Sequence, residues 1–199
     1  REERAAAQAV SSALANRFAH IDVQCDIDTW REYANVKKLH HMIVGFLKMR
    51  PNLLFNMEGS DLRAFPTPRA WEQVCKLVDH PPSLRMKLIR GLVGPGPASE
   101  FEAWAKGINI PDLEEILADP NECRIPAEPG CRYALSSLLA QSITRKNYDK
   151  VDKYIRRKAF GRDFEIVTIM DATKATPGLM ETKAYSEFAT RNQDVVLSS

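Results

Sequence analysis

The sequence has few cysteines, no long apolar run and little net charge, and each absence excludes a class of protein. Its four cysteines, at positions 25, 75, 123 and 131, form no CxxC pair and have no histidine at ligand spacing. A zinc site is therefore not predicted, and reduced thiols in the cytoplasm are the default. No stretch approaches the roughly 20 apolar residues that span a bilayer, and no signal peptide opens the chain, so we expect a cytoplasmic protein without membrane contact.

Motifs for catalysis are also missing. The chain contains no GxxxxGK[ST] phosphate loop, no HExxH and no GxSxG. His40 and His41 are adjacent, and neighbours on a helix point about 100° apart, so they cannot easily share a metal. No metal ligands are predicted, and we expect the histidines to be structural.

What the chain does contain is typical of a globular protein. Its 199 residues are 44% hydrophobic and 27% charged, which suffices for one good core or two small ones. The net charge of +2 gives little general attraction to DNA or to anionic lipid.

The pattern predicts a mainly α fold with a single strand. Residues 18–25, FAHIDVQC, alternate apolar and polar side chains. A lone strand is not stable by itself, so its partner strands would belong to a part of the protein that precedes this chain. The chain opens at Arg1 without an initiator methionine, which also suggests a piece of a longer protein. The helices are expected at 5–15, 29–34, 40–50, 68–78, 81–93, 98–108, 112–119, 133–143, 147–160, 163–175 and 182–192.

One helix start carries an unexpected charge. In AFPTPRAWEQV, residues 64–74, the Thr67 hydroxyl can cap a helix and Pro68 suits its first position. Arg69 then falls in the first turn, where the helix dipole disfavours a cation. Arg69 could pair with Glu72 one turn on, or it could face an anion.

Charge is segregated in the second half. Acids dominate residues 100–122 and bases dominate residues 145–162. Such segregation fits a head-to-tail contact between copies, two solvated helix faces, or a nucleic-acid patch in which Tyr148 and Tyr154 stack on bases. The last of these is disfavoured by the low net charge.

Several motifs together resemble a known family. LANRF followed by HIDV, then the apolar FLKMRPNLL and FPTPRAWEQV, resemble the C-terminal portion of a MoxR-type AAA+ ATPase. The resemblance covers most of the chain and is strongest over 14–78. It implies the last strand of an αβα core within 1–27, a helical lid over 28–94 and a helical extension over 95–199.

The resemblance also implies roles for two arginines. Arg69 matches the sensor-2 arginine that faces the nucleotide phosphates of its own subunit, with Thr67 and Pro68 beside it in the same nucleotide site. Arg17 matches the arginine finger that reaches the nucleotide of the adjacent subunit in a ring. From the residues alone, Arg17 could instead pair with Asp22 or Asp28.

Taken together, the resemblance implies a ring-forming ATPase, expected to be a hexamer, that remodels or activates a protein partner such as a von Willebrand factor A-type protein. ATP and Mg²⁺ would be bound by the full-length protein, because the motifs that hold them are absent here, and this chain alone is expected to be inactive. The alternative is a non-enzymatic helical adaptor or scaffold in which both arginines are structural.

Overall fold

The computed structural model describes residues 16–21, 24–57 and 63–196, and these are mainly helical. The mainly α fold class predicted from the sequence is confirmed. The elements are α3 (Ile27–Val36), α4 (His41–Met49), the 3-10 helix η1 (Pro51–Leu53), α5 (Pro68–Cys75), α6 (Pro82–Val93), α7 (Pro95–Lys106), α8 (Leu113–Ala118), α9 (Pro129–Ser142), α10 (Tyr148–Ile155), α11 (Arg162–Ala175), η2 (Pro177–Glu181), α12 (Lys183–Arg191) and α13 (Gln193–Val196).

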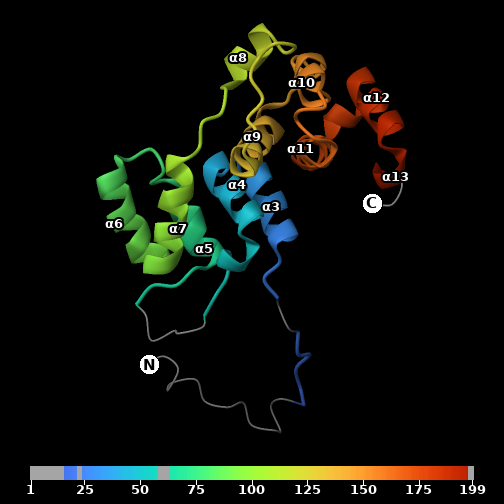
Figure 1. Cartoon of the computed structure of the whole chain (residues 1–199). Coiled ribbons are helices and arrows are strands. Elements are labelled where there is room, and N and C mark those ends of the chain that lie inside the picture. The colour runs from blue at the N-terminus through green and yellow to red at the C-terminus, as the bar shows by residue number, and fades with distance from the viewer. Residues whose placement is uncertain (1–15, 22–23, 58–62, 197–199) are drawn as a thin grey trace.

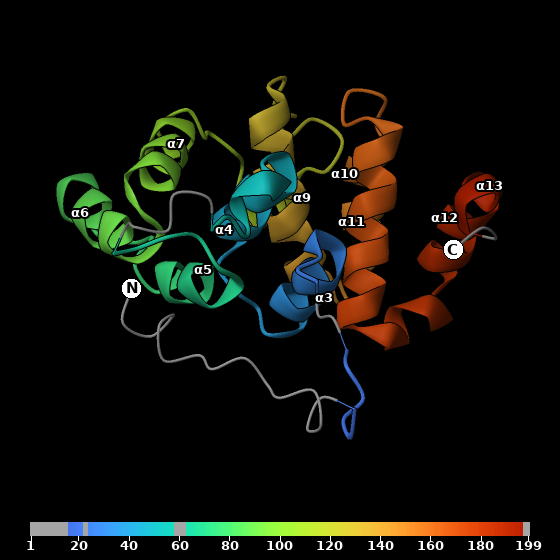
Figure 2. The same cartoon turned by 90° about the horizontal axis from the view of Figure 1, so that it is seen from below.

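The helices form two groups joined by a central layer. In Figure 1, α5, α6 and α7 lie on one side, α10 to α13 lie on the other, and α3, α4 and α9 lie between them. Figure 2, seen from below, shows α9 beside α4, and α11 beside α3 and α9.

The first core is aromatic. Phe46 on α4 is 1% exposed, and its ring centroid lies 5.7 Å from that of Trp71, 5.4 Å from that of Phe101 and 5.5 Å from that of Trp104. Tilted and edge-on rings at this spacing stabilise the fold by more than the burial of their apolar area alone. Phe101 and Trp104 belong to α7, so α7 packs in the same core as α4 and α5.

The second core is built from α8 to α12. Tyr154, Phe160 and Phe164 form a chain of edge-on rings with centroid separations of 5.9 and 6.2 Å. Apolar side chains of α9, α11 and α12 complete it. The long loop between α8 and α9 is fixed on this core because the Tyr154 hydroxyl donates to the Arg124 carbonyl over 2.7 Å.

The two cores meet where α4 crosses α9. A Cβ atom added to Gly45 would lie 2.8 Å from Ala134 Cα, so the two backbones are in direct contact. Beside this crossing, the Lys48 ammonium and the Arg31 guanidinium each donate to Asp171 of α11 over 3.0 Å. The helices of the first core and those of the second therefore pack against each other directly.

The predicted strand is not found in the described part of its range. Residues 18–21 and 24–25 form a turn or have no regular structure, and residues 22–23 lie outside the described residues. A strand needs a neighbour for its hydrogen bonds, and no other strand occurs among the described residues to supply one. The helix predicted over 5–15 also lies outside the described residues. The domain boundaries at 27 and 94 stay predictions.

Candidate functional site at the start of α5

The start of α5 has the geometry predicted from its sequence. Thr67 is extended, with φ at −142°, and its Oγ1 accepts a hydrogen bond from the Ala70 N–H over 3.1 Å. Pro68 occupies the first turn, where its missing N–H costs nothing. Of the free N–H groups at this helix end, the threonine satisfies only one, so the end stays electropositive.

Two contacts hold this helix start against the η1 segment. The fully buried Trp71 donates its Nε1–H to the Leu53 carbonyl over 2.7 Å. The Asn56 N–H donates to the Pro66 carbonyl over 3.2 Å, just before the cap. The position of the first turn of α5 is therefore fixed by η1 and the residues that follow it.

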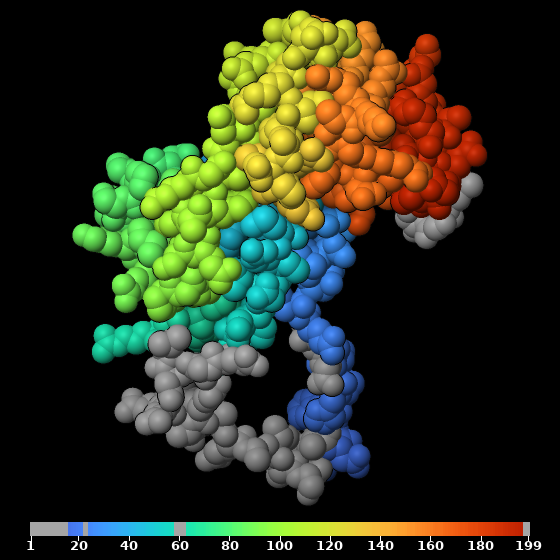
Figure 3. All heavy atoms as spheres, viewed as in Figure 1, coloured from blue at the N-terminus to red at the C-terminus, as the bar shows by residue number. Residues whose placement is uncertain are grey.

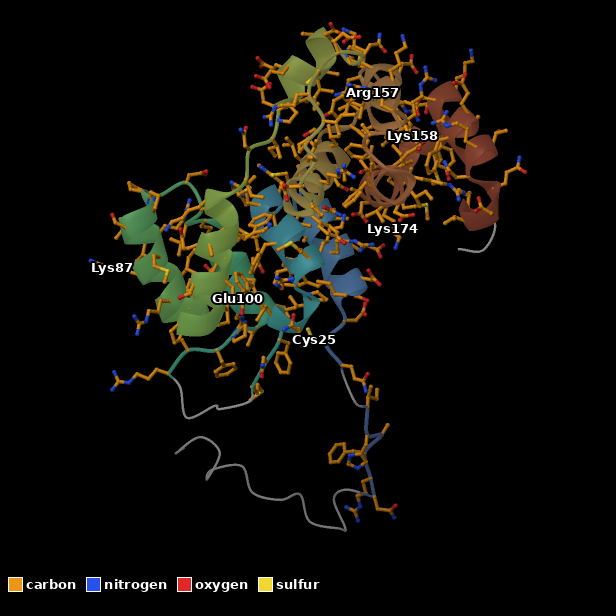
Figure 4. The ribbon with its side chains drawn as sticks, viewed as in Figure 1. Cys25, Lys87, Glu100, Arg157, Lys158 and Lys174 are labelled. Carbon is orange, nitrogen blue, oxygen red and sulfur yellow. The ribbon has the colours of Figure 1, made fainter. Side chains whose placement is uncertain are left out.

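The same segment lines an open pocket. A hollow of about 590 Å³ lies between residues 24–27, which lead into α3, and Pro51, Leu54 and Phe55. Phe55 is 46% exposed, a large apolar side chain left facing solvent beside the pocket. Figure 4 places Cys25 at this lower end of α3. The pocket combines apolar walls with the polar groups of Gln24 and Asp26, which suits a flat ring with polar edges.

The titratable groups of the pocket are not those of a nucleophilic enzyme. Burial, and to a smaller extent Asp26, raise the pKa of the Cys25 thiol, so the thiolate is disfavoured. The Asp26 carboxylate caps α3 by accepting from the Thr29 N–H over 2.7 Å, and this hydrogen bond lowers its pKa. The Cys25 thiol and the Asp26 carboxylate therefore line the pocket without the character of a nucleophile.

Arg69 is exposed on the first turn of α5 and forms no ion pair with a described residue. The partner that the sequence offered, Glu72, instead accepts a hydrogen bond from the Tyr33 hydroxyl over 3.3 Å. The guanidinium is thus not neutralised by the carboxylate one turn on.

Arg17 lies in the segment that precedes α3 and is also exposed. Of its two possible partners, Asp28 pairs with Arg31 over 2.8 Å, and Asp22 lies outside the described residues. Arg17 and the α5 start are on separate segments, and the described contacts do not join them.

The histidine pair lies at the start of α4. The two rings stack with centroids 4.7 Å apart, and His40 Nδ1 accepts from the Met42 N–H, which caps α4. His40 Nε2 lies 3.5 Å from a carboxylate oxygen of Asp79. No group of three metal-ligating side chains occurs in the described part of the chain.

The hypothesis that Tyr148 and Tyr154 of the basic run stack on nucleic-acid bases is not compatible with the packing. Tyr148 is 1% exposed and Tyr154 is fully buried, so neither ring can stack on a base. They are core residues because they occur on the apolar face of α10, where Val151 and Ile155 are also buried.

Sequence reasoning missed the pocket residues and one buried ion pair. Pro51, Leu54 and Phe55 follow the predicted end of an apolar helix, and no local pattern assigns them to the wall of a pocket. Lys48 and Asp171 are 123 residues apart, and no local pattern couples them.

Comparisons with known proteins give no relative. No family model matches this chain, and neither a curated protein nor a solved structure is similar to it. None of the described helices combines the length and the apolar character needed to cross a bilayer.

Proposed function

We propose that this chain is the C-terminal region of a ring-forming AAA+ ATPase of the MoxR type, which couples ATP hydrolysis to the remodelling or activation of a protein partner. In this proposal the helices up to α6 form the lid and the later helices form an extension. ATP and Mg²⁺ are held mainly by a core that precedes the chain. A von Willebrand factor A-type protein is the partner expected from the resemblance, and the ring is a hexamer.

The observation that carries the proposal is the start of α5. Arg69 projects from an electropositive helix end, has no carboxylate partner among the described residues, and belongs to a turn fixed to the wall of an open pocket. A cation at this helix end is unfavourable unless an anion binds both the guanidinium and the free N–H groups. A nucleotide phosphate is such an anion, and the pocket beside η1 has the apolar walls that a base requires.

Arg17 supplies the second role. It is exposed and unpaired with any described residue, on a segment outside the packed helices, so it is available to a neighbouring subunit. A guanidinium supplied across a subunit interface neutralises the charge that develops on the transferred phosphoryl group, and it contributes about 10³-fold or more to the rate in other nucleotidases. The lid helices and the extension would then move as one packed body as the nucleotide changes.

The test is ATP hydrolysis by the full-length protein. We expect Arg17→Ala and Arg69→Ala to reduce kcat by at least about a hundredfold. Lys76→Ala is the matched control, since Lys76 is an exposed cation at the other end of α5. It should retain wild-type turnover.

Mixing subunits separates the two roles. Each variant is combined with a subunit that has lost the acid that holds Mg²⁺ but keeps both arginines. Activity should return for Arg17→Ala, because the inactive neighbour supplies the finger, and should not return for Arg69→Ala, which acts within its own subunit. If both variants hydrolyse ATP like the wild type, or if the full-length protein hydrolyses none, the ATPase proposal is wrong and the adaptor alternative replaces it.

A further inference from the structure

A cationic hollow lies at the corner between α6 and α7, away from the site described above. Its volume is about 550 Å³, and its charged lining consists of Arg63, Lys87 and Arg90. All three are exposed, and none forms an ion pair with another described residue. No carboxylate of a described residue lines the hollow. Lys87 points from α6 into solvent in Figure 4.

The backbone holds these cations together. Gly94, between α6 and α7, has a φ of +88°, and a Cβ atom there would lie 2.9 Å from the Ala64 carbonyl oxygen. The backbone at Ala64 therefore packs directly against the junction of α6 and α7, and this contact places the neighbouring Arg63 at the hollow. Lys87 and Arg90 are three residues apart on α6 and share one face.

Helix α6, which carries two of these cations, also exposes apolar side chains. Leu84 and Leu88 on α6 are 46% and 37% exposed. The two acids of α7 already have partners: Glu102 accepts two hydrogen bonds from Arg85, of 2.6 and 2.9 Å, and Glu100 lies 3.7 Å from Arg50. A mixed apolar and cationic surface of this kind fits an acidic segment of a protein better than it fits a free phosphate.

An acidic segment of that kind occurs on the same chain. None of the five carboxylates in residues 112–122 forms an ion pair with a described residue: Asp112, Glu114, Glu115, Asp119 and Glu122. The nearby cations are used differently. Lys150 donates to the Leu117 carbonyl and Arg157 to the Cys123 carbonyl, while Arg124 donates to Asn109.

The hollow and the acidic segment cannot meet within one molecule. The α6 helix packs on α5 and α7, whereas α8 packs on α9 and α10. Figures 1 and 3 place α6 at one side of the molecule and α8 at another end. Opposite charges at different ends of one chain favour a contact between copies.

We infer that the hollow of Arg63, Lys87 and Arg90 binds residues 112–122 of a second copy, head to tail. This contact deepens the self-association in the proposed function and rests on it for closure into a ring. In this contact the cations of the hollow take the place of the basic run 145–162, which the sequence had suggested as the partner of the acidic segment. Five of the eight bases in the run 145–162 have partners in their own chain. Arg145, Arg156 and Arg162 pair with carboxylates, and Lys150 and Arg157 donate to backbone carbonyls.

The test uses charge reversal in the 199-residue chain, followed by sedimentation velocity. We expect the wild type to self-associate with a dissociation constant that rises with salt. Lys87→Glu with Arg90→Glu, and separately Glu114→Lys with Glu122→Lys, should each weaken association at least about tenfold. Mixing these two double variants should restore association, because each then presents a surface opposite to its partner's.

A matched control reverses two cations of the basic run, Lys153→Glu with Lys158→Glu, and should leave association unchanged. Circular dichroism checks that each variant is folded. A wild type that stays monomeric at low salt, reversed variants that associate like the wild type, or a control that weakens association equally would each overturn the contact. ATP hydrolysis is measured separately on the full-length protein, so loss of the interface and failure of the ATPase proposal give different results.

Discussion

His41 shows how burial changes the behaviour of a single residue. Burial, and secondarily the charge of the stacked His40, lower the pKa of His41 to about 4. The unfolded chain titrates near 6.5. Between these values the unfolded state binds more protons than the folded state does, so stability falls as the pH falls through this window. His40, whose pKa burial also lowers, adds to the same trend.

We therefore expect the free energy of unfolding to decrease by about 1.5 kcal/mol between pH 6.5 and pH 5, where carboxylates remain largely ionised. His41→Gln should flatten this slope because glutamine cannot titrate. Urea unfolding at each pH measures it. His80→Gln, at an exposed histidine, is the control and should leave the slope unchanged. An equal slope in His41→Gln and the wild type would contradict the assignment.

At the scale of elements, the crossing of α4 and α9 depends on one glycine. A Cβ atom at Gly45 would meet the backbone of Ala134 at 2.8 and 2.9 Å, and backbone cannot move aside as a flexible side chain can. Gly91, within α6, has nothing within 4 Å of its Cβ position. The two glycines therefore make a matched pair for the same substitution.

Gly45→Ala is expected to destabilise the protein by about 1 to 3 kcal/mol, because overpacking outweighs the better helix propensity of alanine. Gly91→Ala should instead stabilise it by up to about 1 kcal/mol. Both values come from chemical denaturation. Should Gly45→Ala be as stable as Gly91→Ala, the close approach of α4 and α9 would be wrong.

At the scale of the whole molecule, the two cores are tied by a buried ion pair. Lys48 and Asp171 are each 3% exposed at the side chain, and Arg31 is 19% exposed. Burial lowers the pKa of Lys48, and Asp171 opposes that change by stabilising the ammonium. Removing the carboxylate would leave a buried ammonium without its partner.

Asp171→Asn should cost about 3 to 5 kcal/mol. Glu32→Gln, which removes the exposed pair with Lys174, should cost less than about 1 kcal/mol. Lys174 projects from the end of α11 in Figure 4. All three tryptophans belong to the first core, so their fluorescence reports that core, whereas circular dichroism reports every helix.

The two signals should follow one transition in the wild type, because the cores unfold together. In Asp171→Asn both should shift to lower urea. If the fluorescence transition moved apart from that of circular dichroism in the wild type, the cores would be independent units. If Asp171→Asn cost no more than Glu32→Gln, the ion pair would not join them.

The sequence by itself determined the local structure. The cap at Thr67, the first-turn Pro68 and the apolar spacing of Trp71 and Val74 were sufficient to predict α5, because capping and periodicity depend on residues a few positions apart. The mainly α class was predictable for the same reason. The strand predicted over 18–25 is not found at its described residues, because alternation of side chains does not supply a pairing partner.

Only the tertiary structure decided which side chains are free. In the sequence, the bases of 145–162 and the two tyrosines could equally belong to an exposed helix. In the structure, packing buries the tyrosines and most of the bases have partners in the chain. It leaves Arg69 without its sequence neighbour Glu72 and gathers Arg63, Lys87 and Arg90 at one hollow. Burial and charge pairing depend on residues that are far apart in the chain, and a local sequence pattern does not show which of them meet.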